Sequence, residues 1–496
     1  MRKIIFVIII LFCAAIVRAD IQLPAIIADH MVLKQNSEVA LWGTENPGTK
    51  LVITVTWDNK TYETVADKQG KWISWINTPS AGGPYTICFT GNNQVTVNNV
   101  LIGEVWLSSG QSNMQFEMSK DTQAKTMLPK AKNSHIRLFK VGRQKSETEV
   151  DHFAEGTVWE ICSPESAANF SAMSYYFALD LHKQLDVPVG IINASWGGTP
   201  IESWISTTAI MSDPLLQNVV KRWDVWEKDY EQDNADYARD LEKFRRGELI
   251  VRPKKPQSVL MLERDFRKYG VLYNGMIAPC TPYTLSGVLW YHGTSNVGLA
   301  REYQHQLASL TRTWRSAFNN EELPVIIGQL TAYKGYDLLN GYTLRMAQLN
   351  QNKTLSNYVF CTMDIGLLND LHPPHKQPYG QRFAAMALNK VYGKKDIASM
   401  CPQMKDVKIE NSTLEISFYD SEGLYIGGEK LEDIFIAGED GKFFPAVAEV
   451  RDDTLIVSHP DISKPKIARY LFNNTDKANL FNAAGLPVFP FVGEIR

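Results

Sequence analysis

Cysteine is scarce in this chain, with 6 residues in 496. None of them forms a Cys-x-x-Cys pair or has the spacing typical of a zinc site. The sequence also has no His-Glu-x-x-His motif, no glycine-rich phosphate loop and no dinucleotide fingerprint. We therefore expect no metal and no cofactor. Five cysteines follow residue 19, an odd number that leaves at least one thiol free, and most are expected to be buried structural thiols: Cys88, Cys162, Cys280, Cys361 and Cys401.

An excess of basic residues is missing as well. After residue 19 the chain has 48 basic and 54 acidic residues, which gives a net charge near −6. Proteins that bind nucleic acid carry a basic patch or stripe. The net negative charge therefore excludes a protein that is basic overall, as nucleic-acid-binding domains commonly are, and we expect no nucleic-acid partner.

Long apolar runs are absent after the first 19 residues. There, Arg2 and Lys3 precede the apolar stretch Ile4 to Ile16, and Val17-Arg18-Ala19 follows with small residues suited to cleavage. This is the order of a secretory signal peptide. The run is too short to span a bilayer comfortably, and no later segment reaches the ~20 apolar residues that a span needs. We expect a signal peptide over residues 1–19, no membrane span, and a mature protein that is periplasmic or secreted.

The length of the chain indicates two to four domains. After residue 19 the sequence shows a β-rich pattern, then an alternation of strands and helices, and then a second β-rich pattern. Residues 20–99 contain short β-rich runs between turn signals, such as Trp72–Ile76 and Tyr85–Phe89, which are typical of a small β-sandwich. Residues 401–496 return to this pattern, for example in Thr413–Phe418 and Thr454–Val457. This tail is predicted to form a second β domain or to complete the first.

Between residues 100 and 400, strand-like and helix-like patterns alternate. Helical stretches include Tyr175–Leu185 and Tyr303–Phe318. Alternation of this kind predicts an α/β domain, with a parallel sheet covered by helices on both faces. The expected buried strands are Val100–Leu107, Val187–Asn193, Ser286–Tyr291, Leu323–Gly328 and Tyr358–Thr362.

A charged segment interrupts this order. Of the 50 residues from Lys221 to Gly270, 24 are charged. We interpret residues 215–270 as an exposed helical insertion. A lid over the site, or a surface for a partner, is the alternative.

Polar turns follow several of the predicted strands, where catalytic groups of an open α/β sheet collect. Ser112 follows the first strand, Gly197-Gly198-Thr199 the second, and His292 to Asn296 the third. A serine nucleophile needs a base and an orienting partner. After the last strand, His372 is the best base and Asp370 the nearby carboxylate. Glycine N–H groups suit close approach to an oxyanion, so the turns together favour an acyl-transfer site.

Several of these blocks resemble a known family. Gly103 to Leu107 leading into Ser109-Gly110-Gln111-Ser112-Asn113-Met114 looks like the first block of the sialate O-acetylesterase family, which belongs to the SGNH (GDSL-like) carbohydrate esterases. Trp196 to Trp204 resembles its glycine block, and Asp370-Leu371-His372-Pro373 with Lys376 its histidine block. Leu23 to Leu33, Tyr273 to Pro279, and Gly485 to Phe491 extend the likeness over nearly the whole mature chain.

The resemblance implies a serine esterase that removes O-acetyl groups from sugars without metal or cofactor. Its fold would be a flavodoxin-like SGNH domain with a parallel sheet, flanked by N-terminal and C-terminal β-sandwich-like domains. Carried over by position, Ser112 is the nucleophile and His372 the general base. The N–H groups of Ser112 and of Gly197 or Gly198 would form the oxyanion hole. Four positions in the matching blocks are expected to contact the substrate: Gln111, Asn113, Glu202 and Asn296.

The chain departs from the family pattern in two places. Where relatives read Trp-Tyr-Gln-Gly-Glu-Ser-Asn, it reads Trp290 to Asn296 with His292 for the glutamine and Thr294 for the acid. We expect His292 to take over the amide's hydrogen bond in the oxyanion hole. The broader superfamily has an aspartate three residues before the histidine, where this chain has Asn369. Asp370, two residues before, or a backbone carbonyl would then orient His372.

The sequence therefore predicts an exported carbohydrate O-acetylesterase with an O-acetylated sugar or glycan as its partner. Sialic acid is the first substrate hypothesis. Acetylxylan or another acetylated plant polysaccharide is the second, because the motifs describe the acetyl site and not the sugar. A catalytically weakened glycan-binding protein of the same fold is the third hypothesis, and it is motivated by His292 and Thr294.

Overall fold

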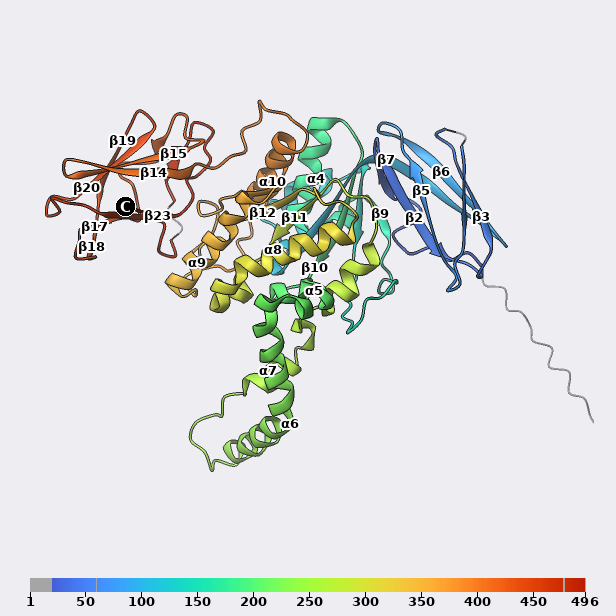
Figure 1. Ribbon diagram of the computed structural model, residues 1–496, viewed down its shortest axis with the longest axis horizontal. Coiled ribbons are helices and arrows are strands. Elements are labelled where there is room, and N and C mark those ends of the chain that lie inside the picture. The colour runs from blue at the N-terminus through green and yellow to red at the C-terminus, as the bar shows by residue number, and fades with distance from the viewer. Residues whose placement is uncertain (1–19, 59, 476–477, 496) are drawn as a thin grey trace, which may run out of the picture.

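The computed structural model describes residues 20–58, 60–475 and 478–495. The predicted signal peptide, residues 1–19, lies outside the described residues. Figure 1 shows three parts in a row: a β domain at the N-terminal side in blue, a central α/β body, and a β domain at the C-terminal side in orange and red. This arrangement confirms the predicted fold class.

A parallel sheet forms the core of the central body. Its strand order is β13-β12-β11-β7-β10-β8-β9, and only the edge strand β9 runs antiparallel to its neighbour. When β8 and β9 are set aside, β10-β7-β11-β12-β13 follow the chain order 2-1-3-4-5 of a flavodoxin-like sheet. The strands are β7 (Gln94–Gly110), β8 (Asn133–Lys140), β9 (Trp159–Cys162), β10 (Val189–Ser195), β11 (Gly287–Tyr291), β12 (Val325–Gly328) and β13 (Asn357–Phe360).

Helices cover both faces of this sheet. Trp106 on β7 packs against Phe177 of α4 (Ala172–Leu185), with ring centroids 5.1 Å apart. Side chains alternate between the two faces along a strand, so Ser109, three residues after Trp106, points to the opposite face from Trp106. On the neighbouring strand β11, the residue paired with Ser109 is Trp290, which therefore also points to that opposite face. It packs there against Trp314 of α8 (Ala300–Ala317), at 5.7 Å. Helix α10 (Gln377–Lys390) packs beside α4, and α9 (Leu338–Leu349) packs beside α8.

Strand β7 is longer than the sequence pattern indicates, and it passes through the expected boundary between residues 99 and 100. Its first half pairs with β6 of the N-terminal β domain, and its second half pairs with β10 and β11. The two sheets therefore share one continuous strand. The other strands of the N-terminal domain are β1 (Val32–Lys34), β2 (Glu38–Thr44), β3 (Lys50–Val55), β4 (Thr61–Val65), β5 (Lys71–Asn77) and β6 (Gly82–Thr90).

The charged segment forms an arm that projects from the central body (Figure 1). It consists of the long helix α6 (Gln217–Arg245), a loop, and the short helix α7 (Gln257–Leu262) packed beside α6. Only the base of α6 is buried, at Val219, Val220 and Trp223. No helix in the described part of the chain is both long enough and apolar enough to cross a membrane.

The C-terminal β domain consists of antiparallel sheets. One has the order β14-β15-β20-β19, another β18-β17-β21-β23, and β16 pairs with β22. Phe472 packs on Tyr342 of α9 at 4.8 Å, which joins this domain to the central body. The strands are β14 (Gln403–Glu410), β15 (Thr413–Tyr419), β16 (Tyr425–Ile426), β17 (Ile434–Ala437), β18 (Phe443–Pro445), β19 (Val447–Arg451), β20 (Thr454–Ser458), β21 (Ile467–Tyr470), β22 (Leu480–Phe481) and β23 (Phe491–Glu494).

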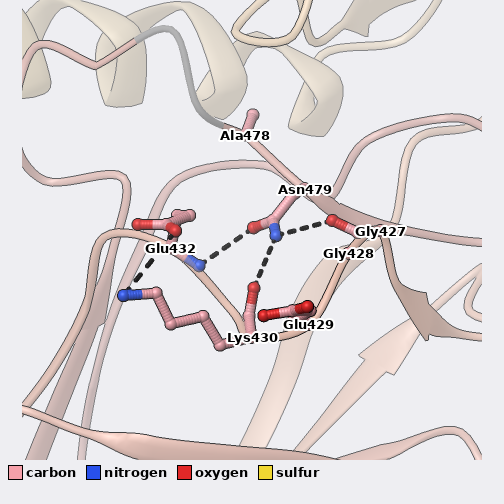
Figure 2. A pocket seen from close by; sticks show the side chains of 7 residues that line it. All are labelled: Gly427, Gly428, Glu429, Lys430, Glu432, Ala478 and Asn479. Atoms are coloured by element: carbon pink, nitrogen blue, oxygen red, sulfur yellow. Dashed lines mark hydrogen bonds and ion pairs between the residues drawn. The ribbon is translucent and has the colours of Figure 1, made fainter.

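A cavity of about 380 Å³ lies on this domain, between residues 427–432 and Asn479 (Figure 2). The Asn479 amide donates to the carbonyl groups of Gly427 and Lys430, at 2.9 and 2.8 Å, and its oxygen accepts from the Glu432 N–H. These polar groups satisfy one another.

Candidate active site

Ser112 lies on a sharp turn at the carboxyl end of β7, in the centre of the sheet. The strand ends at Gly110, whose φ is +140° and where a Cβ would lie 2.1 Å from the Tyr291 carbonyl oxygen, so only glycine fits there. The short helix α1 (Ser112–Gln115) begins at once. Ser112 Oγ lies 2.7 Å from His372 Nε2, although 260 positions separate the two residues.

His372 comes from the loop between β13 and α10. Asp370 shapes this loop, because its Oδ1 accepts a hydrogen bond of 2.8 Å from the His372 backbone N–H. Within the described residues, no hydrogen bond joins the Asp370 carboxylate to the imidazole. Partial burial, and then the positive charge of Lys376, lower the pKa of His372, while Asp370 raises it. The ring is therefore neutral, and able to accept a proton, at neutral pH.

The glycine block follows β10 and lies against the serine. A Cβ on Gly197 would come within 3.1 Å of Ser112 Cβ. The Gly197 N–H donates to Gln115 Oε1 at 2.8 Å, so it is already occupied. Gly198 has a φ of +78° and an open surface around it. Among the described residues, the backbone N–H groups of Ser112 and Gly198 form no hydrogen bond with another loop, so these two donors stay the candidates for an oxyanion hole.

The structure does not place His292 in the oxyanion hole. Its ring is 1% exposed, its Nε2 lies 2.9 Å from the Thr199 carbonyl oxygen, and its Nδ1 lies 3.1 Å from the Tyr303 hydroxyl. Burial lowers its pKa to about 3, so the ring is neutral. A neutral ring with Nε2 protonated donates to Thr199 and accepts from Tyr303. Because both nitrogens are engaged, His292 braces the glycine block instead of donating to an oxyanion.

The four residues expected to contact the substrate are also turned inward. Gln111 accepts from the Gly293 N–H at 2.7 Å, and Asn113 donates to the Leu371 carbonyl at 3.0 Å. Asn296 accepts from the Ile201 N–H at 2.9 Å and donates to Glu202 Oε2 at 2.9 Å. Burial raises the pKa of Glu202, and its bond to Asn296 opposes that shift. These side chains connect the loops to one another because each loop leaves backbone groups that need partners.

Sequence reasoning assigned no role to Gln115, Arg143 or Phe266, which contact the glycine block. Gln115 holds the glycine block, as described above. The guanidinium of Arg143 lies 5.4 Å from the Trp196 ring centroid, and Phe266 stacks on the same indole, with ring centroids 4.9 Å apart and planes 2° apart. Arg143 and Gln115 also line a cavity of about 610 Å³. Arg143 follows β8 in the chain, and a polar residue after a strand was the only signal that marked it.

The sheet and the Ser112–His372 pair at its carboxyl edge define an α/β protein equipped for ester hydrolysis. A family model described as "Carbohydrate esterase, sialic acid-specific acetylesterase" matches residues 102–235 and 260–389, so the chain belongs to this family. It is a carbohydrate esterase.

Relatives of known name resemble this chain over most of its length. Mouse (Mus musculus) sialate O-acetylesterase is 26% identical over 84% of this chain and 83% of its own. The human (Homo sapiens) sialate O-acetylesterase is 23% identical over 79% of this chain and 75% of its own. A crystal structure of a carbohydrate acetylesterase from Xanthomonas citri superposes with a TM-score of 0.82, at 28% identity, and covers 96% of this chain and 100% of the other.

Proposed function

We propose that the protein removes O-acetyl groups from sialic acids, with Ser112 as nucleophile and His372 as general base. The observation that carries the mechanism is the 2.7 Å contact between Ser112 Oγ and His372 Nε2. This is the distance at which an imidazole takes the proton of an attacking hydroxyl. The curated relatives named sialate O-acetylesterase support the choice of sugar.

The reaction then runs in two steps. Ser112 Oγ attacks the acetyl carbonyl while its proton moves to His372 Nε2, and the sugar oxygen leaves with that proton as an alcohol. Water next attacks the acetyl-Ser112 ester and gives a proton to His372. The ester C–O bond breaks as that proton passes to Ser112 Oγ, and the product leaves as acetic acid, which ionises to acetate in solution. In both steps the carbonyl oxygen becomes negative, and the N–H groups of Ser112 and Gly198 stabilise it.

The positions of His292 and Thr294 support an active enzyme over a weakened glycan-binding protein. His292 is engaged with Thr199 and Tyr303, and Thr294 Oγ1 lies 2.8 Å from the Tyr336 hydroxyl. Both departures from the family pattern therefore satisfy groups behind the site. They leave Ser112, His372 and the two candidate N–H groups as they are.

The cavity beside Gln115 supports an acidic sugar. The Arg143 guanidinium forms no hydrogen bond or ion pair within the described residues, and planar guanidinium donors suit a carboxylate. Three carboxylates also line this cavity. Glu117 pairs with Lys120 and Lys140. Glu155 and Glu160 are suited to accept hydrogen bonds from sugar hydroxyls. Sialic acid offers both kinds of group.

A substrate panel tests this choice. Acetate release is measured from O-acetylated sialic acid, from its carboxylate methyl ester and from acetylxylan. We expect the highest kcat/KM for the free acid, and a rise in KM of at least about tenfold for the methyl ester, because hydrogen bonds to a charged group contribute roughly 1.5–3 kcal/mol. Preference for acetylxylan would replace the sialic-acid proposal with the polysaccharide one.

We also propose export to the periplasm or beyond the cell. The order of basic, apolar and small residues in 1–19 supports it. Sequencing of the N-terminus of the protein made in its natural host tests this proposal. We expect a mature chain that begins at Asp20, and a chain that retains Met1 to Ala19 would contradict it.

A further inference from the structure

Lys376 is a buried cation that the reaction above does not use. Its side chain is 0% exposed, and its ammonium group donates to Asn113 Oδ1. The same group lies 4.8 Å from the Phe116 ring centroid and 5.3 Å from that of Tyr379. Removing an ammonium group from water is costly unless it is paired. Lys376 is nevertheless buried beside Asn113, the residue that follows Ser112, and this burial needs an explanation.

Asn113 connects Lys376 to both halves of the catalytic pair. It follows Ser112 in α1, and its amide donates to the Leu371 carbonyl, directly before His372. A further hydrogen bond holds the lysine backbone, since the Lys376 N–H donates to Asp121 Oδ2 at 2.7 Å. The serine turn and the histidine loop are thus held by one buried network.

We propose that Lys376 is a positioning residue for the Ser112–His372 pair. It fixes the Asn113 side chain, and Asn113 holds the Leu371 carbonyl so that the His372 ring faces Ser112 Oγ. Lys376 does not touch the substrate and acts only through these neighbours. The inference rests on the proposed function, in which Ser112 and His372 carry out the chemistry.

The charge of Lys376 also affects the basicity of His372. The ionisable groups around it are Asp121, Asp370, His372 and Tyr379, and Tyr176 donates to Asp121 at 3.0 Å. Burial lowers the pKa of Lys376 to about 7, and the two carboxylates oppose that shift. Lys376 is therefore charged at the lower pH where His372 titrates. There it disfavours a second positive charge on the imidazole.

Replacing the ammonium by an apolar group tests both effects. Lys376→Met is assayed with p-nitrophenyl acetate between about pH 5 and 9, where histidine titrates. We expect kcat to fall at least about tenfold with little change in KM, because small misplacements of reacting groups cost up to ~10² in rate. We also expect the acidic limb of kcat/KM to move to higher pH, since a cation that lowers the pKa of His372 is gone.

Two further variants separate geometry from charge. Asn113→Ala removes the hydrogen bonds to Lys376 and to the Leu371 carbonyl but keeps the lysine. It should therefore lower kcat and leave the acidic limb at its wild-type pH. Lys376→Arg keeps the charge and should also retain the wild-type acidic limb. Thermal unfolding shows which variants are folded, and if Lys376→Met does not fold, the other two decide.

Three results would overturn the inference or its foundation. Wild-type kcat in folded Asn113→Ala would remove the positioning role. An unmoved acidic limb in folded Lys376→Met would remove the electrostatic one. Wild-type protein that releases no acetate from any ester would overturn the proposed function itself, and this outcome is distinct from the other two.

Discussion

At the scale of single residues, Asp370 shows how a carboxylate near a catalytic histidine takes its role from geometry. In other triads the carboxylate bonds the ring nitrogen and sets its tautomer, and replacing it with an amide costs about 10⁴ in kcat. Here the carboxylate bonds the backbone N–H of His372, at 2.8 Å. An asparagine oxygen is able to accept the same hydrogen bond.

Asp370→Asn is therefore expected to lower kcat by less than about tenfold, far short of the ~10⁴ seen where the carboxylate holds the ring. Asp370 raises the pKa of His372, so its loss should move the acidic limb of kcat/KM to lower pH. The measurement is the pH profile of p-nitrophenyl acetate hydrolysis. A loss of 10³-fold or more would show that the carboxylate reaches the imidazole during turnover.

His292 gives a second prediction, on stability. Its pKa is about 3 in the folded protein, below the ordinary 6.5, so the unfolded chain binds a proton first as the pH falls. The stability that comes from keeping this ring neutral is present above about pH 6.5 and is lost as the pH falls toward 3. One such group contributes a slope of about 1.4 kcal/mol per pH unit.

His292→Gln should flatten that slope and keep esterase activity, because an amide is able to donate to Thr199 and accept from Tyr303 without titrating. Urea unfolding between about pH 4 and 7 measures the slope across the range where histidine titrates. His292→Ala is the contrasting variant and should be less stable at every pH. An unchanged slope in the glutamine variant would mean that another group controls the acid sensitivity.

At the scale of elements, the strands and the polar turns were predicted well from the sequence, because a buried strand is a continuous apolar run that stops where the polar turn begins. Val187–Asn193 and Ser286–Tyr291 agree closely with β10 and β11. The inward direction of Gln111 and Asn296 was not predictable, since it depends on which loop lies opposite. The full length of β7 was not predictable either, because pairing with β6 extends it into the N-terminal domain.

The projecting arm gives an element-scale prediction. The family match omits residues 236–259, and Asp233 accepts a hydrogen bond from Ser258, which brings the two sides of the arm together there. Residues 236–256 form the outer part of α6 and the loop that follows it, and the buried residues of α6 all lie at its base. A short Gly-Ser linker in their place should therefore leave kcat/KM for p-nitrophenyl acetate within about twofold, because long changes far from the packed core are tolerated.

A larger glycan is the control substrate for the same variant. If the arm is only an exposed insertion, acetate release from the glycan is also unchanged. A rise in KM for the glycan alone would support the lid or partner-surface alternative. A loss of aryl acetate hydrolysis in a folded variant would contradict the prediction, because it would place part of the arm in the site.

At the scale of the whole molecule, the chain places one hydrolytic site at the centre of a long body. Strand β7 joins the N-terminal β domain to the sheet that carries Ser112, and α9 joins the sheet to the C-terminal domain through Tyr342 and Phe472. Ser112 and His372 were predicted to meet because both follow strands of one parallel sheet. Their partners in the buried network, Lys376 above all, required the tertiary structure.

The most direct test of Ser112 as the nucleophile is the pair of variants Ser112→Ala and Ser109→Ala, assayed for acetate release. Ser109 lies on the same strand end and is 0% exposed, and its hydroxyl has no hydrogen-bond partner among the residues that the structure describes, so its loss should leave activity near wild type. Ser112→Ala should lower kcat by at least ~10³ and unfold at the wild-type temperature, because loss of a nucleophile removes the acyl-enzyme route. Retention of more than about a tenth of the activity by folded Ser112→Ala would show that Ser112 is not the nucleophile.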